Sequence, residues 1–239
     1  MIRTLNAGTL VIQSAYPDPP FDIMKDGTAT GFDIELMRAV CRRRGLALQP
    51  LAYAGDDFNG IFEGLARRTC DAVISGTTIT PERAAKVKFS QPYLEFTQGI
   101  AVNRRLTPHA ASTADLRGLT AGIQKGNTSD AVARRLLAQG DIAAIRYYPY
   151  HGIATALDDL EAGTIGLVIK LFPVISWLTR DRPQLAVAMQ VPTKERLGIA
   201  YATDRADLCD AVDAAIQALR DNGEFARLQA NWPGTEASA

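Results

Sequence analysis

The most informative part of the sequence is Asp71-Ala72-Val73-Ile74-Ser75-Gly76-Thr77-Thr78-Ile79-Thr80-Pro81-Glu82-Arg83. Its first five residues predict a buried strand, and Gly76 lets the backbone come close to a bound molecule. Thr80 and Pro81 are typical of a helix N-cap and of the first helical position. Free helix N–H groups, the hydroxyls of Thr77 and Thr78 and the Arg83 guanidinium therefore converge, and this combination suits a carboxylate. The alternative is an ordinary strand–helix turn with a surface arginine.

Strands and helices alternate along the rest of the chain. Apolar runs predict strands at 10–12, 48–53, 71–75, 99–103, 120–123, 144–147, 166–169 and 198–202. Helical spacing predicts helices from 32 to Gly45 and around 61–65, and at 129–138, 153–162, 173–179, 206–221 and 224–232. The alternation indicates βαβ units, a mostly parallel sheet and an α/β fold class.

The two halves of the chain are not sequential domains. The chain crosses to a second α/β lobe near Thr97–Ile100 and returns near Pro192–Arg196. We therefore predict a discontinuous first lobe of residues 1–97 plus 195–239 and a second lobe of residues 98–194. Two crossings predict a hinge and an interlobe cleft, where sites for small molecules are favoured.

Composition excludes several classes of function. The chain has 239 residues, with Lys+Arg and Asp+Glu both 26, so its formal net charge is zero. It has no basic stripe for nucleic acid, and no apolar run approaches the roughly 18 residues of a membrane span. The start, Met1–Gly8, has no apolar core of signal-peptide length, which indicates either a cytosolic protein or a trimmed leader. Residues Gly234–Ala239 are expected to form a frayed tail.

Metal and redox chemistry have little support. Cys41, Cys70 and Cys209 are far apart in apolar surroundings, so we expect buried free thiols, although one pair could form a disulfide. His109 and His151 lie in polar stretches and are expected at the surface. We predict no metal site and no cofactor.

Seven motifs make the chain resemble a family 3 periplasmic solute-binding protein, the receptor of polar amino-acid ABC importers. They occur in the family's order, they cover nearly the whole chain, and they are 16–21 (YPDPPF), 31–36 (GFDIEL), 71–83, 89–93 (FSQPY), 122–129 (GIQKGNTS), 198–200 (GIA) and 231–232 (NW). The resemblance implies a type II periplasmic-binding-protein fold of two α/β lobes.

The resemblance also assigns roles to individual residues. Arg83, with Thr78 and the backbone of Ser75 and Gly76, would bind the carboxylate of the solute, and Thr128 would close over it from the second lobe. Tyr16 and Phe58 match the family's aromatic walls, with plain core packing as the alternative. Gln124 matches a pocket residue of the second lobe. Gln13 lies where relatives often have Asp, and its neutral amide disfavours a cationic solute side chain.

One departure from the family concerns the amino group. Relatives that bind α-amino acids have an Asp that pairs with the ammonium of the solute, and this position is Leu171 here, preceded by Lys170. A buried ammonium without a counter-charge costs several kcal/mol, out of the ~8 kcal/mol of micromolar binding. We therefore hypothesise a carboxylate without a free amine, with a second acceptor group for Lys170. The alternatives are a register shifted by one residue, or a charge supplied by Asp18, Asp56 or Asp57.

The resulting prediction is a solute receptor rather than an enzyme. It would bind a small carboxylate-bearing solute, an amino acid or a similar molecule, by hinged closure and deliver it to an ABC permease. We expect a monomer in the periplasm or on the extracellular face of the cytoplasmic membrane. Cyclohexadienyl dehydratases resemble the same family, but their catalytic Glu falls here at Val174, which cannot transfer a proton. A ligand-sensing module of a larger protein is a third possibility.

Overall fold

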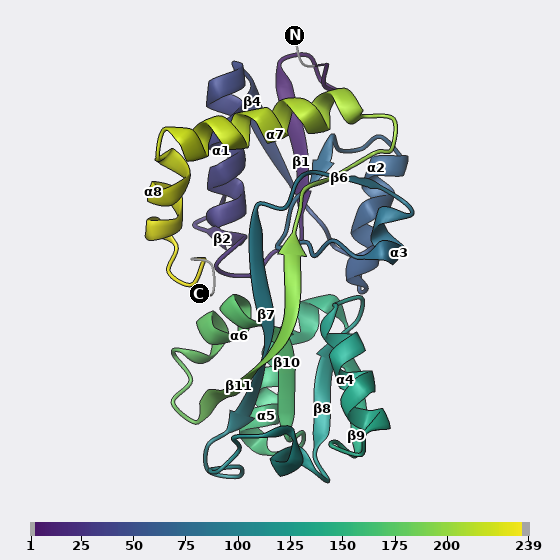
Figure 1. Cartoon of the computed structure of the whole chain (residues 1–239), viewed down its shortest axis with the longest axis vertical. Coiled ribbons are helices and arrows are strands. Elements are labelled where there is room, and N and C mark those ends of the chain that lie inside the picture. The colour runs from purple at the N-terminus through teal and green to yellow at the C-terminus, as the bar shows by residue number, and fades with distance from the viewer. Residues whose placement is uncertain (1–2, 236–239) are drawn as a thin grey trace. The chain divides into compact units, whose positions relative to one another are not determined.

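The computed structural model describes residues 3–235 (Figure 1). The first two residues of the predicted start, and residues 236–239 of the predicted tail, lie outside the described residues. The contacts divide the chain into unit 1 (Met1–Ala54, Gly60–Glu95 and Arg196–Ala239) and unit 2 (Gly55–Asn59 and Phe96–Glu195). Residues 55–59 thus belong with unit 2, whereas the predicted boundaries assigned them to the first lobe.

Unit 1 contains a five-stranded sheet in the order β4-β1-β5-β12-β6. Its strands are β1 (Thr9–Ser14), β4 (Ala47–Ala52), β5 (Ala72–Val73), β6 (Lys88–Phe89) and β12 (Ala200–Tyr201). Strand β1 pairs in parallel with β4 and β5, and β12 pairs antiparallel with β5 and β6. The carboxyl ends of β1 and β5 therefore lie side by side, the edge at which α/β sheets build their sites.

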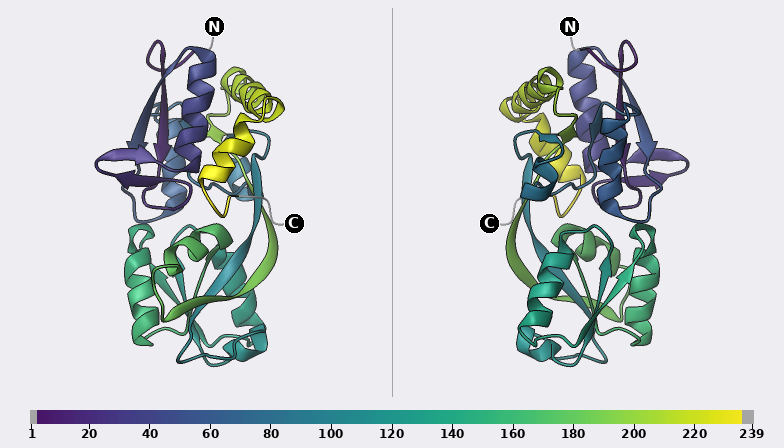
Figure 2. Two further views of the ribbon diagram at one scale, coloured as in Figure 1. Left: turned by 90° about the vertical axis from the view of Figure 1, so that its left-hand side faces the viewer. Right: turned by 90° about the vertical axis from the view of Figure 1, so that its right-hand side faces the viewer.

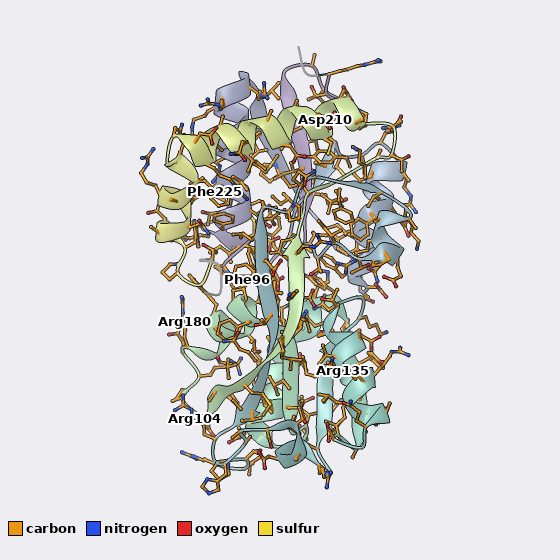
Figure 3. All side chains as sticks on the ribbon, viewed as in Figure 1. Phe96, Arg104, Arg135, Arg180, Asp210 and Phe225 are labelled. Carbon is orange, nitrogen blue, oxygen red and sulfur yellow. The ribbon has the colours of Figure 1, made fainter. Side chains whose placement is uncertain are left out.

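The helices of unit 1 are α1 (Phe32–Arg44), α2 (Glu63–Ala66), α3 (Pro81–Ala84), α7 (Ala206–Asp221) and α8 (Glu224–Asn231). Helix α1 packs on α7 and α8 (Figure 2), and the rings of Phe32 and Phe225 meet edge to face with centroids 5.6 Å apart. Figure 3 shows Phe225 on α8. Helix α1 ends at the predicted Gly45, which adopts the left-handed conformation with φ 67°.

Helix α1 begins where only glycine fits. Gly31 has φ 119°, and a Cβ built on it would lie 2.2 Å from the backbone oxygen of Phe21. This close contact fixes the start of α1 against the loop that follows β1. As a result, Asp33, in the first turn of α1, is buried inside unit 1.

Unit 2 contains a second five-stranded sheet in the order β11-β7-β10-β8-β9. Its strands are β7 (Leu94–Asn103), β8 (Thr120–Gln124), β9 (Ala144–Tyr148), β10 (Leu167–Leu171) and β11 (Leu185–Leu197). Its helices are α4 (Ser129–Ala138), α5 (Ile153–Ala162) and α6 (Phe172–Thr179), with short 3₁₀ turns at Thr113–Leu116 and Tyr150–Gly152. Strands β8, β9 and β10 are parallel, and β10 pairs antiparallel with β7.

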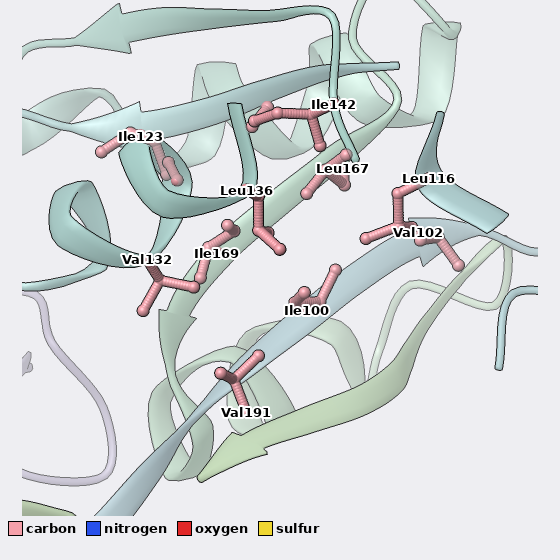
Figure 4. Close-up of a cluster of buried hydrophobic side chains, with 12 residues drawn as sticks. Ile100, Val102, Leu116, Ile123, Val132, Leu136, Ile142, Leu167, Ile169 and Val191 are labelled. Atoms are coloured by element: carbon pink, nitrogen blue, oxygen red, sulfur yellow. The ribbon is translucent and has the colours of Figure 1, made fainter. Parts of the chain in front are cut away.

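The side-chain alternation of these strands builds a core on each face of the sheet. Ile100 and Ile169 point to the face covered by α4, where Val132 and Leu136 complete one cluster (Figure 4). Val168 points to the opposite face and packs against α5 and α6. A strand buried on both faces reads as a continuous apolar run, which explains why 166–169 was recognisable as a strand from sequence.

Two strand features differ from the sequence expectation. Strand β11 runs for 13 residues through Pro192, because it is an edge strand of its sheet, where a missing N–H is tolerated. Strands β2 (Ile23–Lys25) and β3 (Thr28–Thr30) form an unpredicted hairpin. Its turn residues Asp26 and Gly27 both have positive φ, which is typical of a two-residue hairpin turn. Within residues 3–235, no helix combines the length and the apolar character needed to cross a membrane.

Candidate functional site

The first group of predicted site residues lies at the carboxyl ends of β1 and β5 in unit 1. Ser14, the last residue of β1, donates a hydrogen bond to the carbonyl oxygen of Ile74. The backbone N–H of Ala15 donates to Ser75 Oγ at 3.1 Å. These bonds join the loop after β1 to the loop after β5, so the backbone at Ser75 and Gly76 is held by its own unit.

Two buried carboxylates, Asp22 and Asp33, accept hydrogen bonds from the loop after β5. Ser75 Oγ donates to Asp22, and the N–H of Gly76 donates to Asp33 Oδ2 at 2.7 Å. The Tyr93 hydroxyl donates to Asp33 Oδ1 at 2.9 Å. Burial raises the pKa of Asp33 to about 7, although both hydrogen bonds oppose the rise, and burial together with the charge of Asp18 raises the pKa of Asp22. The Gly76 N–H, which we expected to face the solute, is engaged with Asp33.

The predicted turn into a helix exists, and it positions Arg83. Thr80 caps α3 by accepting a hydrogen bond from the Arg83 N–H at 3.3 Å, and Pro81 occupies the first turn, as predicted. Arg83 is 7% exposed, and its Nη1 donates to the carbonyl oxygen of Thr78 at 2.9 Å. Its guanidinium lies 5.6 Å from the ring centroid of Phe62. The structure therefore brings Arg83 and Thr78 together as a buried, preorganised cationic site, not a surface arginine.

Gln13 and Tyr16 also belong to unit 1, and the Tyr16 hydroxyl lies close to Asp22 of the first group. Gln13, on β1, directs its side chain toward Gly64, where an added Cβ would lie 2.2 Å from its Oε1. The Cys70 thiol lies 3.7 Å from the same oxygen. Tyr16 is 9% exposed, and burial raises the pKa of its hydroxyl. The described contacts of Gln13 are thus with the loop around α2.

A second group lies at the carboxyl ends of β8 and β10 in unit 2. Gln124 and Lys170 are both nearly fully buried, and Lys170 Nζ donates to Gln124 Oε1 at 2.8 Å. Gln124 Nε2 donates to the carbonyl oxygen of Tyr150, whose ring centroid lies 5.7 Å from Lys170 Nζ. Two of the predicted residues are therefore direct partners, and an aromatic ring covers the lysine ammonium.

Phe58 belongs to unit 2. Its N–H donates to the carbonyl oxygen of Lys125 at 3.1 Å, and its ring lies 5.1 Å from that of Tyr150. Gly126 makes this packing possible, because a Cβ there would lie 2.6 Å from the Phe58 nitrogen. Phe58, which the predicted boundaries assigned to the first lobe, therefore packs on residues that follow β8 in unit 2, and the order of residues along the chain did not reveal this.

Thr128, before α4, belongs to a network that the sequence did not predict. Its hydroxyl donates to Glu195 Oε2 at 2.9 Å and accepts from Gln98 Nε2 at 3.1 Å. Gln98 Nε2 also donates to Glu195 Oε1 at 3.1 Å. The sequence does contain a signal for Glu195, because Val191, Glu195 and Leu197 share the buried face of β11. A glutamate on an apolar face is a candidate functional residue.

Leu171 lies next to this network. It is 7% exposed and is paired with Gln98 across β10 and β7. Among the acidic residues considered as its substitutes, Asp18 is buried in unit 1, whereas Asp56 and Asp57 are exposed in unit 2. Val174 is fully buried in α6, where it offers no proton-transfer group.

The three cysteines are buried free thiols, as we expected. Burial raises the pKa of Cys41 to about 11, of Cys70 to about 12 and of Cys209 to about 11. A thiol with a raised pKa holds little reactive thiolate at neutral pH. Both histidines are exposed, also as expected.

Comparison with known proteins shows which family the chain resembles. Residues 10–235 match the sequence model of the bacterial extracellular solute-binding proteins, family 3. The L-arginine-binding protein of Pseudomonas aeruginosa is 30% identical over 229 residues, which are 91% of this chain and 84% of the relative. The ABC transporter arginine-binding protein 1 of Escherichia coli (strain K12) is 29% identical over 220 residues, which are 90% of this chain and 86% of the relative.

Solved structures of amino-acid-binding proteins also resemble this chain. The structure of an ancestral arginine-binding protein bound to arginine matches with a TM-score of 0.84 at 26% identity. The match covers 95% of this chain and 98% of the other. The two-lobed α/β fold class expected from the sequence is confirmed.

Proposed function

The chain belongs to family 3 of the bacterial extracellular solute-binding proteins, and from that premise we propose how it recognises its solute. It is the solute-binding component of an ABC importer and a binding protein, not an enzyme. The solute is a small carboxylate-bearing molecule, an amino acid or an amino-acid-like compound, and its carboxylate is bound by Arg83 and Thr78. The observation that carries this proposal is the buried Arg83 guanidinium at the start of α3.

The physical reason is the cost of burying that charge. A guanidinium that is 7% exposed pays a desolvation penalty, which a planar anion with two oxygens can offset through two parallel hydrogen bonds. The Thr78 carbonyl and the Phe62 ring hold the guanidinium in one orientation, so little side-chain entropy is lost on binding. Ser75 and Gly76 support this geometry through the buried Asp22 and Asp33.

The remaining predicted residues supply the specificity of the site in this proposal. Tyr16 and Phe58 bind the carbon skeleton, and Gln124 with Lys170 presents polar groups to the distal end of the solute. Gln13 is neutral, which disfavours a cationic side chain of the solute, and Leu171 offers no counter-charge to an ammonium group of the solute. The relatives named as arginine-binding support an amino-acid-like solute.

We further propose a monomer that works on the outer side of the cytoplasmic membrane, in the periplasm or extracellularly. Family membership gives the two partners, a small solute and a membrane permease. Hinged closure follows from tighter binding of the solute by the closed state than by the open state.

The test is calorimetric titration of the purified protein and of Arg83→Ala with the solute that native mass spectrometry finds on the protein as purified. Truncation of a buried charged partner costs roughly 2–5 kcal/mol, so the affinity should fall at least ~30-fold. Arg67→Ala, an exposed arginine paired with Glu63, is the matched control and should bind normally. Equal affinity in Arg83→Ala, or a co-purified solute without a carboxylate, would overturn the proposal.

A further inference from the structure

Glu195 is a buried carboxylate on β11, close to Leu171. The sheet order of unit 2 places β11, β7 and β10 side by side (Figure 1), so Glu195, Gln98 and Leu171 come from three neighbouring strands. Gln98 is directly paired with Leu171, and it donates to Glu195 at 3.1 Å. Directly opposite residues of an antiparallel pair have Cβ atoms about 5 Å apart. The carboxylate is therefore within side-chain reach of the position where relatives carry the amine-pairing Asp.

The hydrogen bonds fix the orientation of the Gln98 amide. Its nitrogen faces Glu195 Oε1, a carboxylate oxygen that accepts hydrogen bonds, so Nε2 and Oε1 cannot be exchanged. Gln98 Oε1 is buried and has no hydrogen-bond partner among residues 3–235. An amide oxygen in this position needs an N–H donor, because a buried acceptor without a partner is costly.

Glu195 forms no ion pair in the described part of the chain. It is 7% exposed, its two oxygens each accept from a neutral donor, and none of the ion pairs there includes it. Each carboxylate oxygen can accept a second hydrogen bond, so Glu195 keeps acceptor capacity. A carboxylate this deeply buried is costly without a cation.

We infer that Glu195 and Gln98 Oε1 form the acceptor site for an ammonium group of the solute, in place of an Asp at position 171. An ammonium carries three N–H donors, which matches the two carboxylate oxygens and one amide oxygen. A hard metal cation would need six to eight oxygen ligands, so the site suits an ammonium better. This inference rests on the proposed function and narrows its solute to an amine-bearing carboxylate. The leucine that this chain has at position 171, where relatives have Asp, by itself favoured a solute without a free amine.

The experiment compares matched solutes and matched variants. Calorimetry measures the binding of the twenty standard L-amino acids, and the tightest binder is paired with the carboxylic acid that lacks its α-amine. For L-glutamine that analogue is 4-carbamoylbutanoic acid, and for L-arginine it is 5-guanidinopentanoic acid. We expect the amino acid to bind at least tenfold tighter than its analogue.

Substitution of Glu195 separates recognition from support of the fold. Glu195→Gln should lower the affinity for the amino acid at least tenfold and change the affinity for the analogue by less than threefold. The double variant Glu195→Gln, Leu171→Asp should again bind the amino acid more tightly than its amine-free analogue. If Glu195 only supported the fold, the added aspartate would not restore this difference. Asp181→Asn, an exposed carboxylate of unit 2, is the control and should leave both affinities unchanged.

The inference would be overturned by equal affinities for the amino acid and its analogue, by an equal loss of both affinities in Glu195→Gln, or by no binding of any amino acid. A carboxylate without an amine found on the purified protein would do the same, while leaving the proposed function intact. The proposed function itself is contradicted by the two results given above, equal affinity in Arg83→Ala or a co-purified solute without a carboxylate.

Discussion

The stability of unit 1 should depend on pH through Asp33, the buried carboxylate that holds the Gly76 N–H. Burial raises the pKa of Asp33 from 3.8 to about 7. The folded state therefore binds a proton more tightly than the unfolded chain. The stability contributed by this proton is fully present below pH 3.8 and is lost as the pH rises through 7.

The size of the effect follows from the two pKa values. Between pH 5 and pH 7, one carboxyl with these pKa values lowers the free energy of unfolding by about 2 kcal/mol. Asp33→Asn should remove this part of the pH dependence. Its amide mimics the protonated acid, since the oxygen can accept from Gly76 N–H and the NH₂ can donate to the Tyr93 oxygen. The variant should match the wild type at pH 5 and be more stable by about 2 kcal/mol at pH 7.

The assay is urea unfolding followed by circular dichroism at pH 5, 6 and 7. Asp22, whose pKa is also raised, titrates in both proteins, so the comparison isolates Asp33. Asp210→Asn, an exposed carboxylate on α7 (Figure 3), is the control and should keep the pH dependence of the wild type. The same slope in Asp33→Asn as in the wild type would refute the assignment, as would a wild type that gains stability from pH 5 to 7.

Further predictions concern backbone, core and thiols. Gly31→Ala should destabilise unit 1 by at least about 2 kcal/mol in urea unfolding, because the new Cβ would meet a backbone oxygen at 2.2 Å. Gly8→Ala, also at positive φ but with open space around it, should cost about 1 kcal/mol, and equal losses would contradict the steric argument. Leu136→Ala should cost about 2–5 kcal/mol in unit 2, and its exposed neighbour Leu137→Ala less than about 0.5 kcal/mol. The three buried thiols should react with a thiol reagent only after unfolding, so rapid labelling of the native protein would show that they are accessible.

Local sequence patterns determined the secondary structure and one part of the site. The Thr80-Pro81 helix start, the Gly45 helix end and the strand at 166–169 were predictable, because capping and apolar runs depend on neighbours in sequence. The same reasoning placed Arg83 on the helix after β5, and the family resemblance gave it a role.

Contacts between distant segments were decided only by the tertiary structure. Phe58 packs on Tyr150, and Glu195 binds Thr128 and Gln98, across separations in sequence that no local pattern encodes. The Gly76 N–H is bound by Asp33, 43 residues earlier, so a group that looked available is occupied. The sequence could show that Leu171 replaces the usual acid. Only the order of the strands could show which carboxylate lies beside it, because strand neighbours in a sheet are not neighbours in the chain.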